Sequence, residues 1–293
     1  MNATALIAPA RTVDTGGHPA ARVEQGRGWT MYLGDCHVVL PQLDRVDVII
    51  TDPPYSATVH SKSRRGATLP DVNEFGCRHH RAREFGFDAI RPWEVAISSA
   101  YFMRLARRWV LVFSDVELSP VWRAKLTRAG AEHIRTGAWW KVGGTPQFTG
   151  DRPAPGFEAI NIVHPRGRKR WNGGGHAASW AWPPEELPHI FKHPIEANRA
   201  GNRHVRRHTA QKPLPLMLEL VDVFSDPGET VLDAYAGFAT TGVACLRRGR
   251  QFIGIERDET SFTDAVARLR AEEMQSTHHA ARSGQVALFG GGR

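Results

Sequence analysis

A strand, a tight turn, a helix and a second strand follow one another between residues 229 and 256. The first apolar run ends at Asp233, the turn after it is rich in Ala and Gly, and the second run ends at Glu256. In nucleotide-binding α/β folds such a turn lets the ligand approach the first strand, and an acid at the tip of the second strand binds ribose hydroxyls. The G-x-G-x-x-G spacing of dinucleotide oxidoreductases is not found in this turn. We therefore predict an α/β fold with a nucleoside-type cofactor on the turn; the alternative is one ordinary βαβ unit with an acidic end.

A second strand end carries the tetrapeptide Asp52-Pro53-Pro54-Tyr55. It follows the apolar run 46–51, which is typical of a buried parallel strand. Proline has a fixed φ and no N–H, so the two prolines stiffen the backbone and leave its carbonyls free to accept hydrogen bonds. A carboxylate, rigid carbonyls and an aromatic ring suit a flat ring that bears an exocyclic amine. The alternative is a plain strand-to-loop turn, where Asp-Pro and Pro-Pro are common.

Together these segments resemble the amino-group DNA methyltransferases of the permuted (β) class, in which the catalytic motif precedes the cofactor motif. The resemblance runs from about Tyr32 to about Leu269. It implies that Asp52-Pro53-Pro54-Tyr55 is the catalytic motif. It also implies that residues 233–241 form the turn that binds S-adenosyl-L-methionine (AdoMet), and that Glu256 binds the ribose.

Two further segments are similar to the family's cofactor contacts. The run His208-Thr209-Ala210-Gln211-Lys212-Pro213 resembles the His-x-x-Gln-Lys-Pro segment that closes over the methionine part of AdoMet, and residues 32–36 resemble the strand end whose Asp meets the adenine. Residues 140–158, with Lys141 and Glu158, are similar to stretches of phage and prophage members. The resemblance thus implies AdoMet as the cofactor, bound by Asp35, Thr209, Gln211, Lys212, Pro213, Asp233, Ala236, Gly237, Thr241 and Glu256.

For the reaction, the resemblance implies methyl transfer to the amine of a base that is flipped out of a duplex. Asp52 would accept one N–H of the amine and the Pro53 carbonyl the other, which exposes the nitrogen lone pair, while Tyr55 stacks on the base. Adenine N6 is the expected target, because family members with Asp rather than Ser at the start of the motif favour adenine. Cytosine N4 remains an alternative target, and RNA or protein an alternative substrate.

The cofactor turn departs from the family pattern Asp-Pro-Phe-x-Gly-Ser-Gly-Thr-Thr. Here Ala234 replaces Pro, Tyr235 replaces Phe, Phe238 replaces Ser and Ala239 replaces the second Gly. The Cβ of Ala239 is expected either to crowd the cofactor or to force a conformation that only glycine adopts cheaply. This departure keeps a further alternative open, a DNA-binding protein with a degenerate AdoMet pocket.

The implied architecture is a Rossmann-like, AdoMet-dependent methyltransferase fold of the α/β class. It has a mixed, mostly parallel seven-stranded sheet with helices on both faces. Leu214, Met217, Val221 and Phe224 recur at helical spacing and predict a helix after Pro213. Residues 1–28 have no periodicity and are predicted to form a mobile N-terminal arm, residues 29–272 the methyltransferase domain, and residues 273–293 a flexible C-terminal tail.

The charge of the chain favours a polyanionic partner. The 293 residues carry a net charge of +8, as in many nucleic-acid-binding proteins, and the resemblance implies double-stranded DNA. The polar insertion 56–91 is expected to contact DNA, and the basic, tryptophan-containing segment 164–207 is expected to recognise the target; the alternative is that its tryptophans only pack on the sheet. The predicted DNA-binding residues are Lys62, Arg64, Arg65, Arg168, Lys169, Arg170, Arg206 and Arg207.

Other classes of site and partner receive less support. Cys36, Cys77 and Cys245 lie far apart without a C-x-x-C pair, so neither a disulfide framework nor a metal site is predicted. There is no long apolar segment and no signal-peptide pattern, so we expect a cytoplasmic protein without a membrane partner, as a monomer or a homodimer. Gln285–Phe289 resembles the Gln-x-x-Leu-Phe peptides that bind bacterial sliding clamps, a match that short tails also produce by chance.

Overall fold

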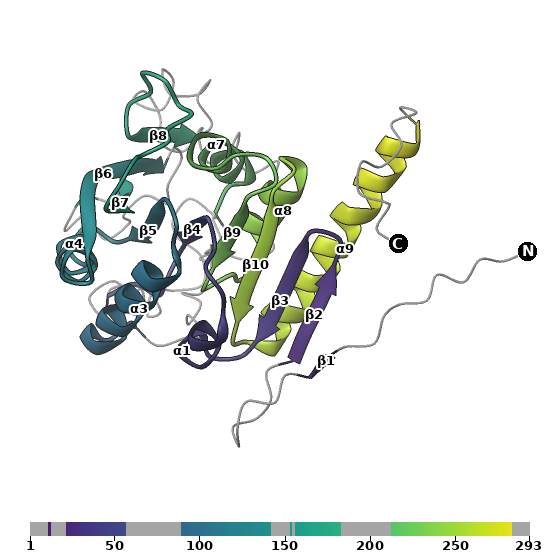
Figure 1. Cartoon of the computed structure of the whole chain (residues 1–293), viewed down its shortest axis with the longest axis horizontal. Helices are drawn as coiled ribbons and strands as arrows, with labels where there is room; N and C mark the ends of the chain where they lie inside the picture. The colour runs from purple at the N-terminus through teal and green to yellow at the C-terminus, as the bar shows by residue number, and fades with distance from the viewer. Residues whose placement is uncertain are drawn as a thin grey trace, which may run out of the picture.

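The computed structural model describes residues 11–12, 22–56, 89–141, 153, 156–182 and 212–282 (Figure 1). Several predicted features lie outside these residues. They are Lys62, Arg64, Arg65, Arg206, Arg207, Thr209, Gln211 and the segment Gln285–Phe289.

One mixed sheet organises the described chain. Its strand order is β1-β2-β3-β10-β9-β4-β5-β7-β6-β8. The five strands β3, β10, β9, β4 and β5 run parallel to one another, β7 is antiparallel to β5, and β6 is antiparallel to β7. The bounds are β1 (Arg11–Thr12), β2 (Arg22–Gly26), β3 (Trp29–Leu33), β4 (Val48–Thr51), β5 (Val110–Ser114), β6 (Ala131–Lys141), β7 (Phe157–Pro165), β8 (Ser179–Trp182), β9 (Thr230–Asp233) and β10 (Gln251–Glu256).

The predicted α/β architecture is confirmed, but the strand number is not. The seven strands from β3 to β6 match the predicted mixed, mostly parallel sheet, and three more strands extend its edges, which gives ten among the described residues. At one edge β2 pairs antiparallel with β3, and β1 with β2; at the other, β8 pairs parallel with β6. Unpaired backbone groups at the edges of the predicted sheet are thereby satisfied by neighbouring segments of the same chain.

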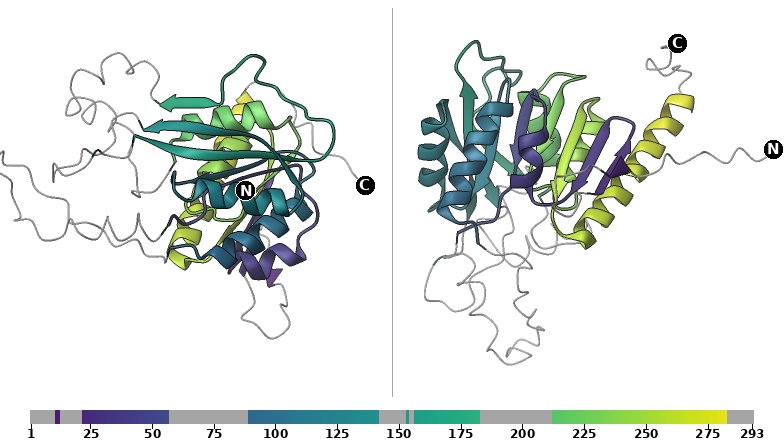
Figure 2. Two further views of the ribbon diagram at one scale, coloured as in Figure 1. Left: turned by 90° about the vertical axis from the view of Figure 1, so that its left-hand side faces the viewer. Right: turned by 60° about the horizontal axis from the view of Figure 1, so that its bottom comes forward.

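Helices cover both faces of the sheet (Figures 1 and 2). The helices α7 (Leu214–Phe224), α8 (Thr240–Arg247) and α9 (Glu259–Arg282) pack on one face. On the other lie α1 (Cys36–Val39), the 3-10 turn η1 (Leu40–Gln42), α3 (Pro92–Leu105) and α4 (Ser119–Arg128). Strand β4 shows the alternation that this layering demands, because Val48 and Ile50 belong to the first core and Ile49 to the second. No helix among the described residues has the length and apolar character needed to cross a membrane.

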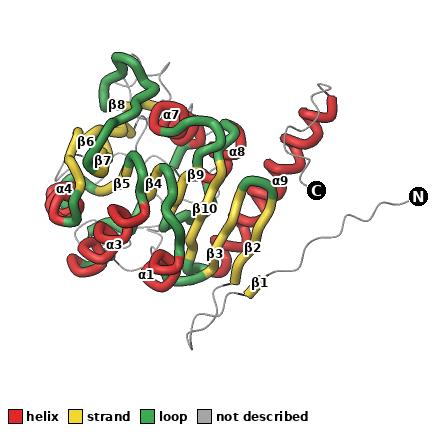
Figure 3. Tube along the Cα trace, viewed as in Figure 1, coloured by secondary structure: helices red, strands yellow, loops and turns green. Residues whose placement is uncertain are grey.

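Two described elements extend beyond the predicted boundaries of the domain. Residues 22–26 form β2, whose Val23 is buried and pairs with Tyr32, so they belong to the sheet rather than to an arm. At the other end α9 continues to Arg282, past the predicted boundary at 272/273 (Figure 3). The two extensions are joined, since the Trp29 indole Nε1 donates to Glu273 Oε2 at 3.1 Å and the Arg27 amide donates to Glu273 Oε1 at 3.1 Å. The sequence did not predict these two extensions, because they are stabilised by contacts between segments far apart in the chain.

Helix α8 packs directly on Phe252 of β10 because Gly242 has no side chain. A Cβ at this position would lie 2.6 Å from the ring carbon Cδ1 of Phe252 and 2.9 Å from Leu269 Cδ2. Both neighbours are buried, so neither can move away freely. The first turn of α8, which follows the predicted cofactor turn, is positioned by this contact.

We predict that Gly242→Ala destabilises the protein by about 1–3 kcal/mol through overpacking against Phe252. Helix propensity alone predicts the opposite sign, a gain of about 1 kcal/mol. Equilibrium unfolding in denaturant decides between the two. Gly175→Ala is the matched control, because a Cβ there meets no described atom within 4 Å; a Gly242→Ala variant as stable as this control would contradict the packing argument.

Candidate active site

The carboxyl ends of β4, β9 and β10 bring the predicted catalytic and cofactor residues to one edge of the sheet. These strands are parallel neighbours in the order β10-β9-β4. Asp52 follows β4 directly, Asp233 is the last residue of β9, and Glu256 is the last residue of β10. Open α/β sheets bind their ligands at this edge.

Asp52 is engaged by a buried lysine. The Lys212 ammonium Nζ lies 2.5 Å from Asp52 Oδ2 and also donates to the Tyr55 hydroxyl at 2.9 Å, while the Tyr55 hydroxyl donates to Asp52 Oδ1 at 3.3 Å. The Lys212 side chain is 8% exposed and that of Asp52 24%. Burial raises the pKa of Asp52, and the adjacent ammonium opposes this rise.

A second carboxylate shares the same ammonium. Glu158 Oε2 lies 3.0 Å from Lys212 Nζ, and its other oxygen pairs with Lys141. Although burial acts to raise the pKa of Glu158, the two ammonium groups hold this pKa at about 2. Between two carboxylates, the pKa of Lys212 is raised despite its burial. Two carboxylates and two ammonium groups therefore form one charge-balanced cluster.

Lys141 and Glu158 belong to the site, although sequence analysis gave them no role. They were part of the 140–158 stretch, but 16 intervening positions separate them in the chain. The antiparallel pairing of β6 with β7, in which Trp139 faces Glu158 and Trp140 faces Phe157, brings them together. The signal in the sequence was an acidic residue at the start of an apolar run. It points to this site only once the pairing of β6 with β7 is known.

Three aromatic rings surround the same ammonium. Lys212 Nζ lies 5.1 Å from the centroid of Phe113, 5.4 Å from that of Tyr55 and 5.6 Å from that of Trp139. These distances permit cation–π attraction. The rings come from β5, from the segment after β4 and from β6. The Lys212 ammonium beside Asp52 is thus surrounded by flat aromatic faces and by oxygen acceptors.

On the cofactor side, Asp233 organises the turn from within. Its buried carboxylate accepts hydrogen bonds from Thr51 Oγ1 at 2.9 Å, from Thr241 Oγ1 at 2.7 Å and from the Tyr235 amide at 3.1 Å. Burial raises the pKa of Asp233 to about 6. Thr51 immediately precedes Asp52, so this carboxylate ties the end of β4 to the predicted cofactor turn. Asp233 and Thr241 are thus placed together as predicted, each bonded to the other.

Glu256 fixes the tip of the same turn. One carboxylate oxygen accepts from the Gly237 amide at 2.8 Å and the other from the Asp258 amide at 2.8 Å. Burial raises the pKa of Glu256. The Ala236 amide donates to the Ile255 carbonyl at 2.9 Å, which adds a backbone bond between turn and strand. The predicted cofactor residues Ala236, Gly237 and Glu256 therefore lie together at one strand end.

Ala239 adopts the conformation that glycine adopts cheaply. It has φ 53° and ψ 43°, in the left-handed region, and it is the one described residue other than glycine with a positive φ. Its side chain is fully buried in the core. The expected conformational consequence is therefore confirmed, whereas the Cβ packs inward among core residues.

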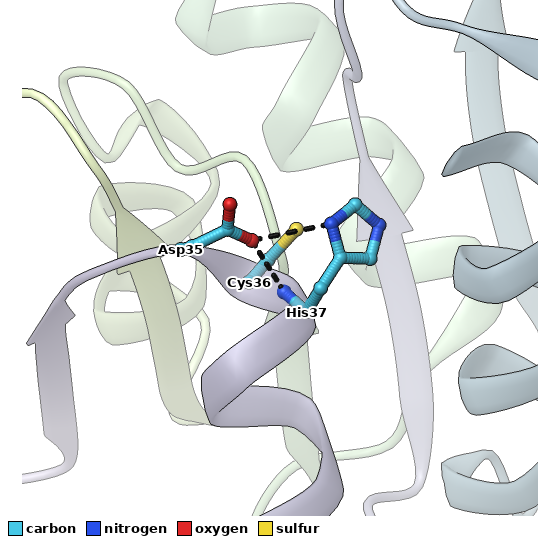
Figure 4. A group of neighbouring side chains, drawn as sticks. All are labelled: Asp35, Cys36 and His37. Atoms are coloured by element: carbon cyan, nitrogen blue, oxygen red, sulfur yellow. Dashed lines mark hydrogen bonds and ion pairs between the residues drawn. The ribbon is translucent and has the colours of Figure 1, made fainter. Parts of the chain in front are cut away.

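Asp35 is held at the end of β3 by the start of α1. Its Oδ1 accepts from the His37 amide at 2.7 Å and lies 3.2 Å from the His37 ring nitrogen Nδ1 (Figure 4). The hydrogen bond from His37 lowers the pKa of Asp35, and the same interaction raises that of His37. The other ring nitrogen, Nε2, lies 3.0 Å from Ser98 Oγ, which in turn lies 3.1 Å from the Tyr235 hydroxyl. The strand end beside the cofactor turn is thereby linked to Tyr235.

The ligand-type atoms of Asp35, Cys36 and His37 also lie within 4.8 Å of one another. Metal binding requires a thiolate and a free imidazole nitrogen. Burial raises the pKa of the Cys36 thiol to about 12, and both nitrogens of His37 already have partners. The group is better described as a helix cap than as a metal centre.

The three described residues predicted to bind DNA lie away from this edge. Strand β7 runs antiparallel to β5 and carries the chain back to the amino ends of the parallel strands. There Lys169 pairs with Glu132 at 2.5 Å and Arg170 with Asp226 at 2.8 Å. Arg168 directly precedes them in the chain and is exposed. The structure therefore does not bring Arg168, Lys169 and Arg170 to the catalytic edge.

The tryptophans of the same segment contribute to packing. Trp180 is 2% exposed in the first core, and Trp171 packs against that core with its ring 5.0 Å from that of Phe224. Trp109, at the start of β5, donates its indole N–H to the Arg170 carbonyl at 2.6 Å. For residues 164–181 the packing alternative accounts for the tryptophans.

Comparison with known proteins places this geometry in a family. Residues 46–267 match the family model N6_N4_Mtase, described as DNA methylase. The methylase YubD of Escherichia coli strain K12 is 36% identical over 91 residues, which are 31% of this chain and 37% of that protein. The type II methyltransferase M.HindIII of Haemophilus influenzae is 42% identical over 66 residues, 22% of this chain and 21% of that protein. The chain thus matches well under half the length of these curated relatives.

A solved structure extends the likeness to nearly the whole fold. The crystal structure of the M1.HpyAVI–SAM complex superposes with a TM-score of 0.55 and 19% identity, over 82% of this chain and 99% of that one. At 19% identity the superposition supports the fold alone. The family match, by contrast, covers three quarters of the sequence and both strand ends of the site. The chain belongs to the N6_N4_Mtase family of DNA methylases.

Proposed function

We propose that this protein transfers a methyl group from AdoMet to the exocyclic amine of a flipped base in double-stranded DNA, with adenine N6 as the target. One observation carries the proposal. The catalytic motif and the cofactor turn lie on neighbouring strands, and the Thr51–Asp233 hydrogen bond of 2.9 Å joins them directly. A methyl donor held at one strand end and an amine held at the other would then meet along this edge.

The reaction requires the chain to position the target amine against the methyl donor and to polarise the N–H bonds of that amine. An exocyclic amine is a poor nucleophile because its lone pair is delocalised into the ring. Asp52 accepts one N–H and the Pro53 carbonyl the other, which draws the nitrogen toward sp³; Pro54 keeps the corner rigid and Tyr55 stacks on the base. The new N–C bond forms as the C–S bond breaks, the electron pair stays on sulfur, and the nitrogen then releases a proton, with Asp52 as the nearest acceptor.

AdoMet binding is assigned to the turn and to its neighbours. The carboxylate of Glu256 has lone pairs left after accepting two amide N–H groups, so it can also accept from ribose hydroxyls. Asp35 at the end of β3 is assigned to the adenine, and Ala236 and Gly237 to the face that the cofactor approaches. Asp233 and Thr241 support the turn. The resemblance assigns Thr209, Gln211, Lys212 and Pro213 to the segment that closes over the methionine part.

DNA is expected to approach this edge. The segments 57–88 and 183–211 join the described chain at Ser56, Ala89, Trp182 and Lys212. Ile90 donates its amide to the Tyr55 carbonyl at 3.2 Å, and Trp182 faces Lys141 in the sheet. These segments contain Lys62, Arg64, Arg65, Arg206 and Arg207, which we assign to phosphate contacts. The clamp-type peptide in the tail stays a prediction, as does a monomeric or dimeric state.

Adenine N6 is assigned from the Asp at the start of the tetrapeptide. Cytosine N4 is the second candidate, because the family to which the chain belongs is named for both amines. We predict that DNA from a methylation-free host expressing this chain carries N6-methyladenine in one defined sequence context. Single-molecule sequencing reads base and context together. N4-methylcytosine in place of N6-methyladenine would overturn the target, and DNA without any modified base would overturn the proposed function.

Replacing the catalytic carboxylate should abolish turnover while leaving cofactor binding intact. We predict that Asp52→Ala lowers the rate of DNA methylation by at least about 10²-fold, because the amine loses its acceptor. AdoMet affinity, measured by calorimetry, should stay within about twofold of the wild-type value, since Asp52 lies on the base side of the site. Asp44→Ala, at an exposed position before β4, is the control and should behave as wild type. Equal activity of the two variants would remove Asp52 from the mechanism.

The cofactor assignment has its own test. We predict that Glu256→Gln weakens AdoMet binding about tenfold or more, because an amide accepts hydrogen bonds at one oxygen only and loses the charge that favours ribose hydroxyls. Glu24→Gln, which removes an exposed ion pair of 2.7 Å with Arg270, serves as the matched control. Calorimetry without DNA gives both affinities. If the wild-type protein gave no saturable AdoMet binding, the pocket would be degenerate and the DNA-binding alternative would stand.

A further inference from the structure

The ammonium of Lys212 occupies the place that the proposed reaction assigns to the target amine. It donates to Asp52 Oδ2, the carboxylate that is to accept the amine's N–H, at 2.5 Å. The rings of Tyr55, Phe113 and Trp139 surround it, and such rings would face a flipped base. An ammonium and an amine present the same kind of N–H donor to an oxygen acceptor. The site therefore holds an internal N–H donor where the substrate's donor is expected.

Base entry then requires this charge to move. The Tyr55 hydroxyl takes the other oxygen of Asp52, so neither oxygen is without a donor. A buried ammonium that loses its carboxylate partner without finding another costs several kcal/mol. Water is a poor replacement here, because the Lys212 side chain is only 8% exposed. The ammonium needs a second carboxylate within reach of its present position.

Glu158 supplies that second carboxylate. Its Oε2 already lies 3.0 Å from Lys212 Nζ, so no large movement is needed to transfer the ammonium fully to it. Glu158 is itself held in place, because Lys141 pairs with its other oxygen and its backbone lies in the β6–β7 ladder. Its pKa of about 2 keeps it ionised throughout the physiological range. Lys212, by contrast, has a flexible four-carbon stem.

We propose that Lys212 is a place-holder for the target amine, and that Glu158 is the positioning residue that takes the Lys212 ammonium from Asp52 when the base enters. This deepens the proposed function and rests on it. The cluster keeps Asp52 paired while no base is bound. On base entry the amine replaces the ammonium at Asp52, and the ammonium stays paired with Glu158. No described residue other than Asp52 and Glu158 offers a carboxylate to Lys212.

The test compares two DNA duplexes that carry the recognition sequence, one with the target base and one abasic at that position. Only the first requires Lys212 to move. In Glu158→Gln the ammonium loses its receiving charge, so we expect the Kd for intact DNA to rise about tenfold or more and the Kd for abasic DNA to stay within about twofold of wild type. Fluorescence anisotropy with sinefungin in place of AdoMet measures both. Glu272→Gln, which removes the 2.8 Å ion pair with Arg247 far from the site, is the control and should change neither value.

A second background isolates the role of Lys212. In Lys212→Gln there is no ammonium to relocate, so adding Glu158→Gln should leave the ratio of the two Kd values unchanged. An equal rise for intact and abasic DNA, or the same tenfold effect in the Lys212→Gln background, would overturn the proposal. If Glu158→Gln fails to fold, Glu158→Asp keeps the charge at a shorter reach, and an intermediate penalty confined to intact DNA is expected. If the wild-type protein methylates no DNA, the proposed function itself is wrong. If it methylates DNA but Glu158→Gln leaves the ratio of the two Kd values unchanged, only the role proposed for Lys212 and Glu158 is wrong.

Discussion

The buried carboxylate of Asp233 is the contact on which the arrangement of the site depends. It ends β9 and collects hydrogen bonds from Thr51 at the end of β4, from Thr241 on α8 and from the Tyr235 amide in the turn. Leaving such a carboxylate buried without partners would cost several kcal/mol. The three donors must therefore stay together. Because Thr51 precedes Asp52, whatever fixes the cofactor turn also fixes the catalytic corner.

The cluster around Lys212 consists of buried ion pairs, whereas Asp233 is held by neutral hydrogen-bond donors. Buried ion pairs add little stability compared with apolar packing, because desolvation offsets their attraction. Here Lys141, Lys212, Asp52 and Glu158 balance in charge, which makes the cluster tolerable without making it a source of stability. Its arrangement is informative because one member, Lys212, has two carboxylates within 3.0 Å of its ammonium nitrogen. A charge with two carboxylate partners can shift from one to the other at little cost, as the proposed place-holder role of Lys212 requires.

Sequence predicted those parts of the fold and site that are contiguous in the chain. The tetrapeptide at 52–55 and the turn at 233–241 each follow an apolar run, so their position at strand ends could be read directly, and the helix after Pro213 was predicted from its spacing. Contacts that depend on strand pairing could not be read in this way. Glu158 is brought to Lys141 only by the pairing register of β6 with β7. Residues 168–170 lie at the opposite edge of the sheet from Asp52, because β7 runs antiparallel to β5. The edge strands β1, β2 and β8 were missed for the same reason, since short strands carry no clear periodicity.

The predicted cofactor turn departs from the family pattern in its side chains, while hydrogen bonds still fix the backbone that a cofactor would contact. The left-handed conformation of Ala239 costs about 1–2 kcal/mol relative to glycine, and the burial of its methyl group offsets part of this cost. The turn is fastened on both sides of that residue, because Glu256 accepts from the Gly237 amide and Arg268 donates to the Phe238 carbonyl at 2.9 Å. Tyr235 gains a hydroxyl contact to Ser98 that phenylalanine would lack. Backbone hydrogen bonds therefore fix this turn although four of its side chains depart from the family pattern, and this favours the proposed AdoMet pocket over a degenerate one.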